Sequence, residues 1–242
     1  MVNQQVIDKP GTVVEASAKI QVKARSPYVS RGGEKLAKAL ATFSIQVEDR
    51  ICLDGGISTG GFTDCLLQAG AKRVYGIDVG YGQVDWRLRT DPRVILKERT
   101  NLRYLPPEEL YAPEQPYPDL GVVDVSFISL TKVLPAFWQL LQAPREVVLL
   151  VKPQFEAGKS RVGKQGVVRD PQVQAEAIAQ VLKVAQDLGW QYAGLTWSPL
   201  TGPAGNLEFL LWLGMNSQTP APSLEVIQQV TQTAQQQLLR KS

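Results

Sequence analysis

The chain has 242 residues, 44% of them hydrophobic, which is enough for one large α/β domain and a small appendage. It contains no histidine, so mechanisms that need an imidazole base, a histidine metal ligand or a Ser-His-Asp triad are excluded. The net charge of +3 is mild, but basic residues gather in two stretches, 19–38 and 152–170. Such patches suit a phosphate-rich partner, although ordinary solvated surface is the simpler interpretation of charge alone.

Two further absences narrow the class of protein. No apolar run approaches the ~18 residues of a membrane span and no signal peptide opens the chain, so we expect a cytoplasmic protein without a membrane role. The two cysteines, Cys52 and Cys65, lie in apolar stretches and lack the spacing of metal ligands. We therefore predict buried, reduced thiols and no bound metal.

Residues 2–24 contain two short strand patterns around a turn signal at 8–11, and two strands cannot bury a core of their own. A helix is predicted over 33–43, where apolar residues recur on one face. From there to the end, short apolar strands alternate with amphipathic helices, which predicts a doubly wound, mostly parallel sheet with helices on both faces. In chain order we predict strands at 50–54, 73–78, 94–98, 119–125, 146–151, 191–197 and 207–213, and helices at 61–69, 84–89, 130–141, 171–188 and 223–239.

A glycine-rich loop, 53–64, follows the first strand of this predicted sheet. Glycines let a backbone approach a ligand closely, and the amides of the next helix can face a carboxylate. About twenty residues later, Asp78 ends the second strand, where a carboxylate can accept hydrogen bonds from the two ribose hydroxyls of an adenosine. These features predict a nucleoside cofactor. NAD is one alternative, but Asp54 suits the ammonium of S-adenosylmethionine better; a strand–helix turn without any ligand is the other alternative.

Two buried strands end in ionisable residues. One ends in Asp124, and the strand 147–151 is followed by Lys152. Because the carboxyl ends of parallel strands meet at one edge of a sheet, both side chains are expected beside the glycine loop. A lysine there is partly removed from water, and a neighbouring carboxylate keeps it in place. For each residue alone there is a simpler interpretation: Asp124 as an acid that caps a strand end, and Lys152 as a lysine directed to the surface. Their expected meeting at the edge with the glycine loop favours a catalytic role for the pair.

The order of the motifs resembles one family. Residues 28–214 are similar to the TlyA family, the hemolysin A-type rRNA methyltransferases of the FtsJ-like fold. The resemblance implies a Rossmann-like class I methyltransferase domain at 26–242, with a seven-stranded sheet, which uses S-adenosylmethionine to methylate a ribose 2′-hydroxyl of ribosomal RNA. The matching stretches are 28–36, 58–65, 78–83, 98–101, 124–130, 151–156, 163–170 and 205–209.

The resemblance also assigns site residues. Ribose 2′-O-methyltransferases of this fold use a Lys-Asp-Lys-Glu tetrad, which maps onto Lys35, Asp124, Lys152 and Glu208. In this assignment Lys152 is the general base, Asp124 orients it, and Glu208 holds Lys35 and the sugar. One departure is Gly55, where the family leads us to expect a larger apolar residue, and which predicts a looser loop. Cofactor contacts are expected at Asp54, Gly56, Ser58, Thr59, Gly60, Gly61, Phe62, Asp78, Thr100 and Asn101, with Thr100 and Asn101 near the adenine.

RNA phosphates are expected to contact Arg31, Arg161 and Lys164, which lie in the two basic stretches. The family begins with an S4-like RNA-binding module, and residues 1–25 resemble only its second half, a β-hairpin. Three other functions stay open: a non-catalytic RNA-binding protein, a membrane-active hemolysin and a base methyltransferase. The intact tetrad disfavours the first, the lack of an apolar spanning stretch the second, and the lack of an Asn-Pro-Pro-Tyr-like or catalytic cysteine motif the third.

Overall fold

A computed structural model describes residues 13–15, 17–19 and 27–239. The predicted hairpin at 2–24 therefore lies almost wholly outside the described residues. The strands form one seven-stranded sheet with the order β3-β2-β1-β4-β5-β7-β6. Their bounds are β1 (Ile51–Gly55), β2 (Arg73–Ile77), β3 (Val94–Lys97), β4 (Leu120–Val123), β5 (Glu146–Val151), β6 (Gln191–Trp197) and β7 (Phe209–Gly214).

The sheet is doubly wound and mostly parallel, as predicted. β1 pairs in parallel with β2 and β4, and the parallel pairing continues from β2 to β3 and from β4 to β5. β7 is the exception, because it runs antiparallel to both β5 and β6. The amino end of β7 therefore lies at the edge where β1, β4 and β5 have their carboxyl ends.

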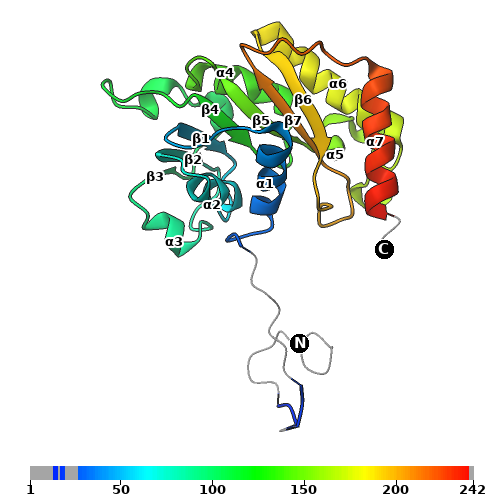
Figure 1. Ribbon diagram of the computed structural model, residues 1–242, viewed down its shortest axis with the longest axis horizontal. Coiled ribbons are helices and arrows are strands. Elements are labelled where there is room, and N and C mark those ends of the chain that lie inside the picture. Colours follow the sequence, from blue (N-terminus) through cyan, green and yellow to red (C-terminus); the bar gives the residue numbers. More distant parts are fainter. Residues whose placement is uncertain (1–12, 16, 20–26, 240–242) are drawn as a thin grey trace.

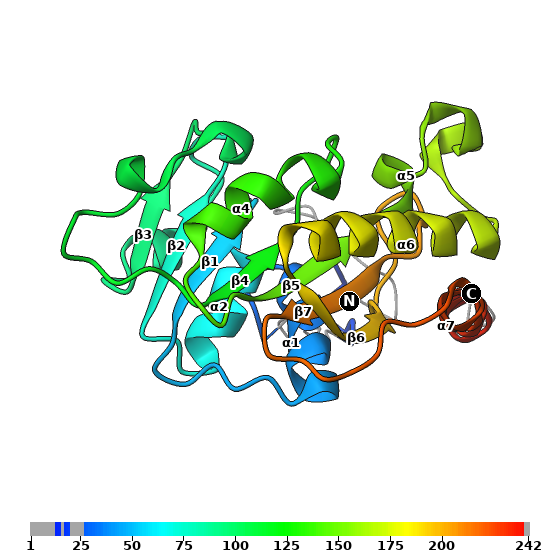
Figure 2. The same cartoon turned by 90° about the horizontal axis from the view of Figure 1, so that it is seen from above.

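Helices cover both faces of the sheet, with α4 and α6 on one face and α1 and α2 on the other (Figure 2). Helix α7 packs against α6 beside β6 (Figure 1). Each face has its own apolar core, one containing Phe137 and Trp190 and the other Leu36 and Leu66. The helix bounds are α1 (Gly32–Phe43), α2 (Gly61–Gln68), α3 (Trp86–Arg89), α4 (Leu134–Leu140), α5 (Pro153–Glu156), α6 (Pro171–Leu188) and α7 (Leu224–Leu239).

The central strands are apolar along their whole length because both faces of the sheet are covered. In β5, every residue after Glu146 is buried. Cys52 and Cys65 are free and buried, as predicted. Burial raises the pKa of each of these thiols to about 12, so neither is a reactive thiolate at neutral pH. No helix of the described residues is both long and apolar enough to cross a membrane.

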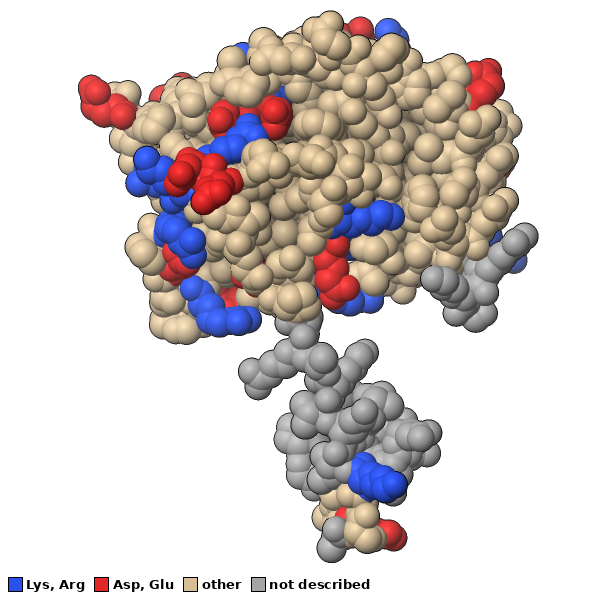
Figure 3. Space-filling model, viewed as in Figure 1, with Lys and Arg blue, Asp and Glu red and all other residues tan. Residues whose placement is uncertain are grey.

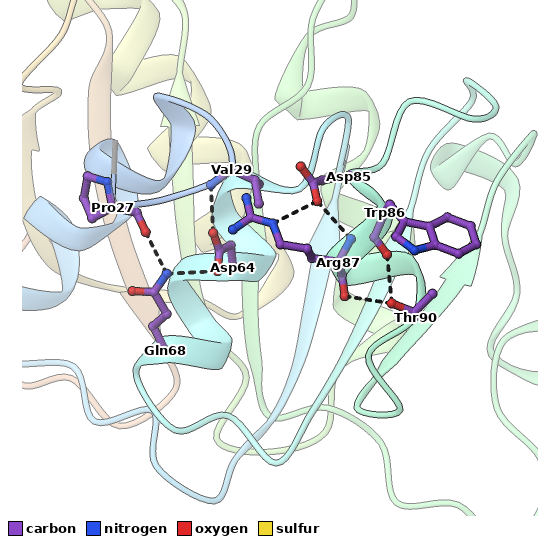
Figure 4. Close-up of polar contacts among 8 residues, drawn as sticks. All are labelled: Pro27, Val29, Asp64, Gln68, Asp85, Trp86, Arg87 and Thr90. Atoms are coloured by element: carbon purple, nitrogen blue, oxygen red, sulfur yellow. Dashed lines mark hydrogen bonds and ion pairs between the residues drawn. The ribbon is translucent and has the colours of Figure 1, made fainter. Parts of the chain in front are cut away.

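The segment that enters α1 is fastened to α2 (Figure 4). The Val29 N–H donates to the Asp64 carboxylate at 2.8 Å, and the Gln68 side-chain amide donates to the Pro27 carbonyl at 2.9 Å. These two hydrogen bonds bring the first turn of α1 beside the first turn of α2. The glycine-rich loop and the predicted lysine of α1 therefore share one side of the sheet.

One predicted helix is wrong as a single element. In place of a helix over 130–141, the structure has a 3₁₀ turn, η3 (Leu130–Lys132), followed by the separate helix α4. Pro135 lies in the first turn of α4, and its nitrogen has no hydrogen to donate to the carbonyl one turn earlier. A helix over 130–141 would lose this hydrogen bond in its interior, which favours the break observed here.

Candidate active site

Strand direction brings four ionisable side chains to one edge of the sheet. Asp124 directly follows β4 and Lys152 directly follows β5. Glu208 directly precedes β7, and because β7 is antiparallel its amino end meets the carboxyl end of β5, with Val151 opposite Phe209. Helix α1 adds Lys35 from the covering layer. The four residues of the predicted tetrad therefore come together.

The tetrad forms two close ion pairs. Lys152 Nζ lies 2.6 Å from Asp124 Oδ1, and Lys35 Nζ lies 2.6 Å from Glu208 Oε2. All four residues line one cavity of about 540 Å³. Glu208 is only 2% exposed and Lys152 only 8%, so each charge depends on its partner rather than on water.

Sequence reasoning missed a second contact of the strand-end lysine. Lys152 Nζ also donates to Ser126 Oγ at 2.8 Å. Besides its bond to carbon, the lysine nitrogen has three positions for hydrogen-bond partners, and Asp124 and Ser126 occupy two of them. The described residues provide no partner at the remaining position. The only signal in the sequence was that Ser126 follows Asp124 by two residues, which by itself does not indicate a contact with Lys152.

A second cavity, of about 430 Å³, lies beside the first. The two cavities share Gly56, Ser58, Asp124 and Ser126 in their walls. Gly56 has a φ of +89°, and a Cβ there would come within 2.5 Å of the Asp124 carbonyl oxygen. Only glycine fits this close crossing of the loop over the end of β4. Because of this shared wall, the cavity of the predicted catalytic residues and the cavity of the predicted cofactor residues adjoin each other.

Asp78 stands at the end of β2 in the wall of the second cavity. Its two carboxylate oxygens accept hydrogen bonds from the backbone N–H of Ser58 at 2.8 Å and of Gly80 at 2.7 Å. The backbone thus holds this carboxylate at the cavity wall. Thr100 and Asn101, predicted to lie near an adenine, line the same cavity.

Asp54 has a different place from the other predicted cofactor residues. It is fully buried at the end of β1 and lines neither cavity. Thr63 donates to one carboxylate oxygen at 2.7 Å, and the other oxygen has no hydrogen-bond partner among the described residues. Burial, and then the negative charges of Asp124 and Asp78, raise the pKa of Asp54 to about 7, against the hydrogen bond from Thr63.

The other predicted cofactor residues divide into two groups. All except Asp54 and Gly60 line one or both cavities; these are Gly56, Ser58, Thr59, Gly61, Phe62, Asp78, Thr100 and Asn101. Gly60 has a φ of +98° and packs against Leu88, which a Cβ would meet at 2.2 Å. The expected looseness at Gly55 is absent, because a Cβ there would be 2.8 Å from Leu102, whose side chain fills the space.

The predicted RNA contacts are in different surroundings. Arg31 is exposed and lines the tetrad cavity. Lys164 is exposed but lies outside both cavities. Arg161 forms an ion pair with Glu176 and donates to the Ala157 carbonyl. Some of its N–H groups are therefore already used within the protein, which leaves fewer for an RNA phosphate.

Sequence reasoning missed a set of exposed residues on the loops near the second cavity, which we call the aromatic–arginine surface and define as Tyr81, Arg99, Arg103, Tyr104 and Phe127, the last of which lines that cavity. Its three aromatic side chains are highly exposed, Phe127 to 92%. Arg99 stacks over Tyr81 with 4.1 Å between guanidinium carbon and ring centroid, and Arg103 over Tyr104 with 5.1 Å. These residues lie on loops that follow β2, β3 and β4, at the same edge as the tetrad.

A third cavity, of about 770 Å³, adjoins the second cavity and shares Phe127 and Ile128 with it. Its wall also contains basic side chains, Arg103, Lys132 and Lys159.

Figure 3 shows that charged side chains on the α1 face gather on the α2–α3 side, whereas the part over β6 and α7 has few. The described residues contain no group of three or more acidic or cysteine side chains placed to hold a metal ion.

Comparisons with known proteins agree with this geometry. A sequence from Bacillus subtilis, YqxC, described as a candidate rRNA methyltransferase, is 44% identical over 99% of this chain and 85% of its own length. The 16S/23S rRNA (cytidine-2′-O)-methyltransferase TlyA of Mycobacterium tuberculosis is 50% identical over 85% of this chain and 76% of its own.

Among solved structures, a Lactococcus lactis protein described as a candidate hemolysin is 45% identical, with a TM-score of 0.79 over 85% of this chain and 98% of its own. The family model of the FtsJ-like methyltransferases matches residues 28–215, which include the tetrad and both cavities. With this match over most of its length, the chain belongs to the FtsJ-like methyltransferase family.

Proposed function

We propose that this protein transfers a methyl group from S-adenosylmethionine to a ribose 2′-hydroxyl of ribosomal RNA, in the cytoplasm. The observation that carries the proposal is the pairing of Lys152 with Asp124 and of Lys35 with Glu208 in one cavity that adjoins a nucleoside-sized cavity. A ribose hydroxyl is a poor nucleophile and needs a base as it attacks. The relative TlyA carries this activity in its name, toward cytidine.

The mechanism assigns the proton transfer to Lys152. In its neutral form the amine has two hydrogens and one lone pair. Asp124 and Ser126 accept the hydrogens, so the lone pair is directed into the cavity, where it accepts the proton of the 2′-hydroxyl. Lys35, held by Glu208, contributes a positive charge beside the hydroxyl that loses its proton. Holding the hydroxyl in line with the methyl group supplies much of the remaining rate enhancement.

The second cavity fits S-adenosylmethionine. Asp78 would accept hydrogen bonds from its ribose hydroxyls, and the crossing at Gly56 would let the backbone approach the methionine part. Asp54 precedes Gly56 by two residues and lines neither cavity, so its negative charge would act on the cofactor's ammonium through the loop rather than by direct contact. When bound, the cofactor supplies an electrophilic methyl group on a positively charged sulfur.

The substrate is RNA because the surface around the site suits a flexible polyanion. Bases stack on exposed aromatic rings, and arginines contact phosphates. The aromatic–arginine surface provides both, and Phe127 extends it to the wall of the cofactor cavity. We also propose that residues 1–25 act as an S4-like RNA-binding segment ahead of the catalytic domain.

The test is to incubate the protein with labelled S-adenosylmethionine and ribosomal RNA from cells that lack the corresponding methylation. A 2′-O-methyl group blocks alkaline cleavage of the neighbouring phosphodiester, because the attacking hydroxyl is capped. The label should therefore be recovered in an alkali-resistant dinucleotide. Label on a free base, or no transfer to RNA at all, would contradict the proposal.

Cofactor affinity should depend on the protonation of Asp54. Its raised pKa of about 7 means that the free protein holds this carboxyl neutral below that pH and charged above it. A cationic cofactor favours the charged form, so binding releases a proton and weakens as pH falls. We expect affinity about tenfold lower at pH 6 than at pH 8, measured by calorimetry. In Asp54→Asn this dependence should flatten to that of the cofactor's own amine; an unchanged pH profile would show that Asp54 is not linked to binding.

RNA affinity should depend on the aromatic–arginine surface. Arg103→Ala should weaken binding of ribosomal RNA several-fold and lower the slope of log affinity against log salt by about one, as expected for one lost phosphate contact. Lys183→Ala is the control, because Lys183 is an exposed cation on α6 and lies outside every cavity wall described above. Equal effects of the two substitutions would indicate general electrostatics rather than a contact at Arg103.

A further inference from the structure

A third buried acid besides Asp54 and Glu208 is Glu156, which follows the strand-end lysine by one helical turn. It ends the short helix α5 and is only 7% exposed. Its carboxylate accepts hydrogen bonds from the Ser129 hydroxyl and, at 2.8 Å, from the Leu130 backbone N–H. No cation among the described residues forms an ion pair with it. A buried carboxylate without a cation is costly, so two hydrogen bonds to one loop are its main compensation.

That loop, 124–130, carries both groups that contact Lys152 Nζ. Asp124 is at its start and Ser126 follows two residues later. Between these residues and the Glu156 contacts lies Phe127, which has a φ of +64° and a nearly fully exposed side chain. A non-glycine residue in the left-handed region is unfavourable by itself and persists only where its neighbours are held. The loop therefore needs an anchor at its far end.

We infer that Glu156 is a positioning residue for the methyl transfer, which fixes the loop 124–130 so that Asp124 and Ser126 stay on Lys152. Glu156 and Lys152 are on the same short segment after β5, so the anchor and the base move together. The loop is held to this segment at both ends: by Lys152 through Asp124 and Ser126, and by Glu156 through Ser129 and Leu130. This inference rests on the proposed function, since it assigns Lys152 as the base.

A purely structural role makes a different prediction. A carboxylate that only caps the 3₁₀ turn η3 would affect folding stability and leave the orientation of the base unchanged. Glu156→Ala would then slow transfer by the same factor whatever residue occupies position 152. A positioning role acts through Lys152, so its effect should vanish when the base is absent.

The experiment measures single-turnover methyl transfer to ribosomal RNA for Glu156→Ala in two backgrounds, wild type and Lys152→Ala. We expect at least about tenfold slowing in the first and little further slowing in the second, because misplacement of a reacting group is costly only while that group acts. Glu156→Gln should recover most of the rate, since its amide oxygen still accepts from Leu130. Tyr111→Phe is the control for a lost buried hydrogen bond, because Tyr111 donates to the Leu140 carbonyl far from the base.

Hydrogen exchange gives a readout that does not need activity. In Glu156→Ala the amides of 124–130 should exchange faster while those of β4 and β5 stay protected, and Tyr111→Phe should leave the loop unchanged. Ser129→Ala is a milder variant should the first fail to fold, and it should show the same pattern with a smaller effect. Unchanged loop exchange, or equal slowing in both backgrounds, would overturn the inference; a wild-type protein that transfers no methyl group to RNA would contradict the proposed function instead.

Discussion

Replacing Lys152 by alanine is expected to slow methyl transfer to RNA at least about 10²-fold, the low end of the effect of a positioned base. The lysine stands at the end of β5, and its contacts are Asp124 and Ser126 rather than the glycine-rich loop. The Asp124 side chain is 23% exposed, so water can reach it once Lys152 is gone, and the fold should change less than on breaking a fully buried ion pair. The measurement is single-turnover transfer of labelled methyl groups, with cofactor affinity determined separately by calorimetry.

A variant that keeps the positive charge separates a base from a simple positive charge at this position. Lys152→Arg keeps the charge, but a guanidinium stays protonated and cannot accept the hydroxyl proton, so it should be almost as slow as Lys152→Ala. Lys183→Ala, at an exposed lysine on α6, is the control and should keep the wild-type rate. A fast Lys152→Arg variant would leave only proximity and electrostatics as the source of catalysis.

The site residues that follow the parallel strands could be predicted from the sequence pattern. An apolar strand followed by an ionisable residue indicates a side chain at the carboxyl edge, which is how Asp78, Asp124 and Lys152 were found. The glycine-rich loop 53–64 could be placed at the same edge by the same argument. The structure brings these residues together around two adjoining cavities.

The site residue beside the antiparallel strand β7 could not be predicted in this way. Glu208 precedes its strand, and hydrophobic periodicity does not reveal that β7 runs opposite to β5. Only the family resemblance pointed to Glu208 and Lys35. Strand direction depends on which edges pair in three dimensions, which is information that a local pattern lacks.

Contacts made through loops were also beyond the sequence. Ser126 and Glu156 lie in motifs that were recognised, yet their roles depend on how the loop 124–130 folds back on the segment after β5. The break before α4, by contrast, had a signal in the sequence, because Pro135 lacks the N–H that a helix over 130–141 would need at that position.

Glu208→Ala is expected to lower both stability and activity. Glu208 is almost fully buried, and its partner Lys35 has a side chain only 12% exposed, so removing the acid leaves an ammonium with little water and no counter-charge. Breaking a buried ion pair from one side costs about 3 kcal/mol or more, which for a chain of this size lowers the melting temperature by about 6–12 °C. Methyl transfer should fall at least about tenfold, because Lys35 is no longer held at the reacting hydroxyl.

The double variant Lys35→Ala with Glu208→Ala distinguishes the two effects. Removing both charges also removes the uncompensated one, so the melting temperature should recover part of the loss seen in Glu208→Ala. Activity should not recover, because the positive charge beside the hydroxyl is then missing altogether. Thermal unfolding and single-turnover transfer, measured on the same samples, give both quantities. A double variant that regains wild-type transfer together with its stability would show that this ion pair only supports the fold and takes no part in the reaction.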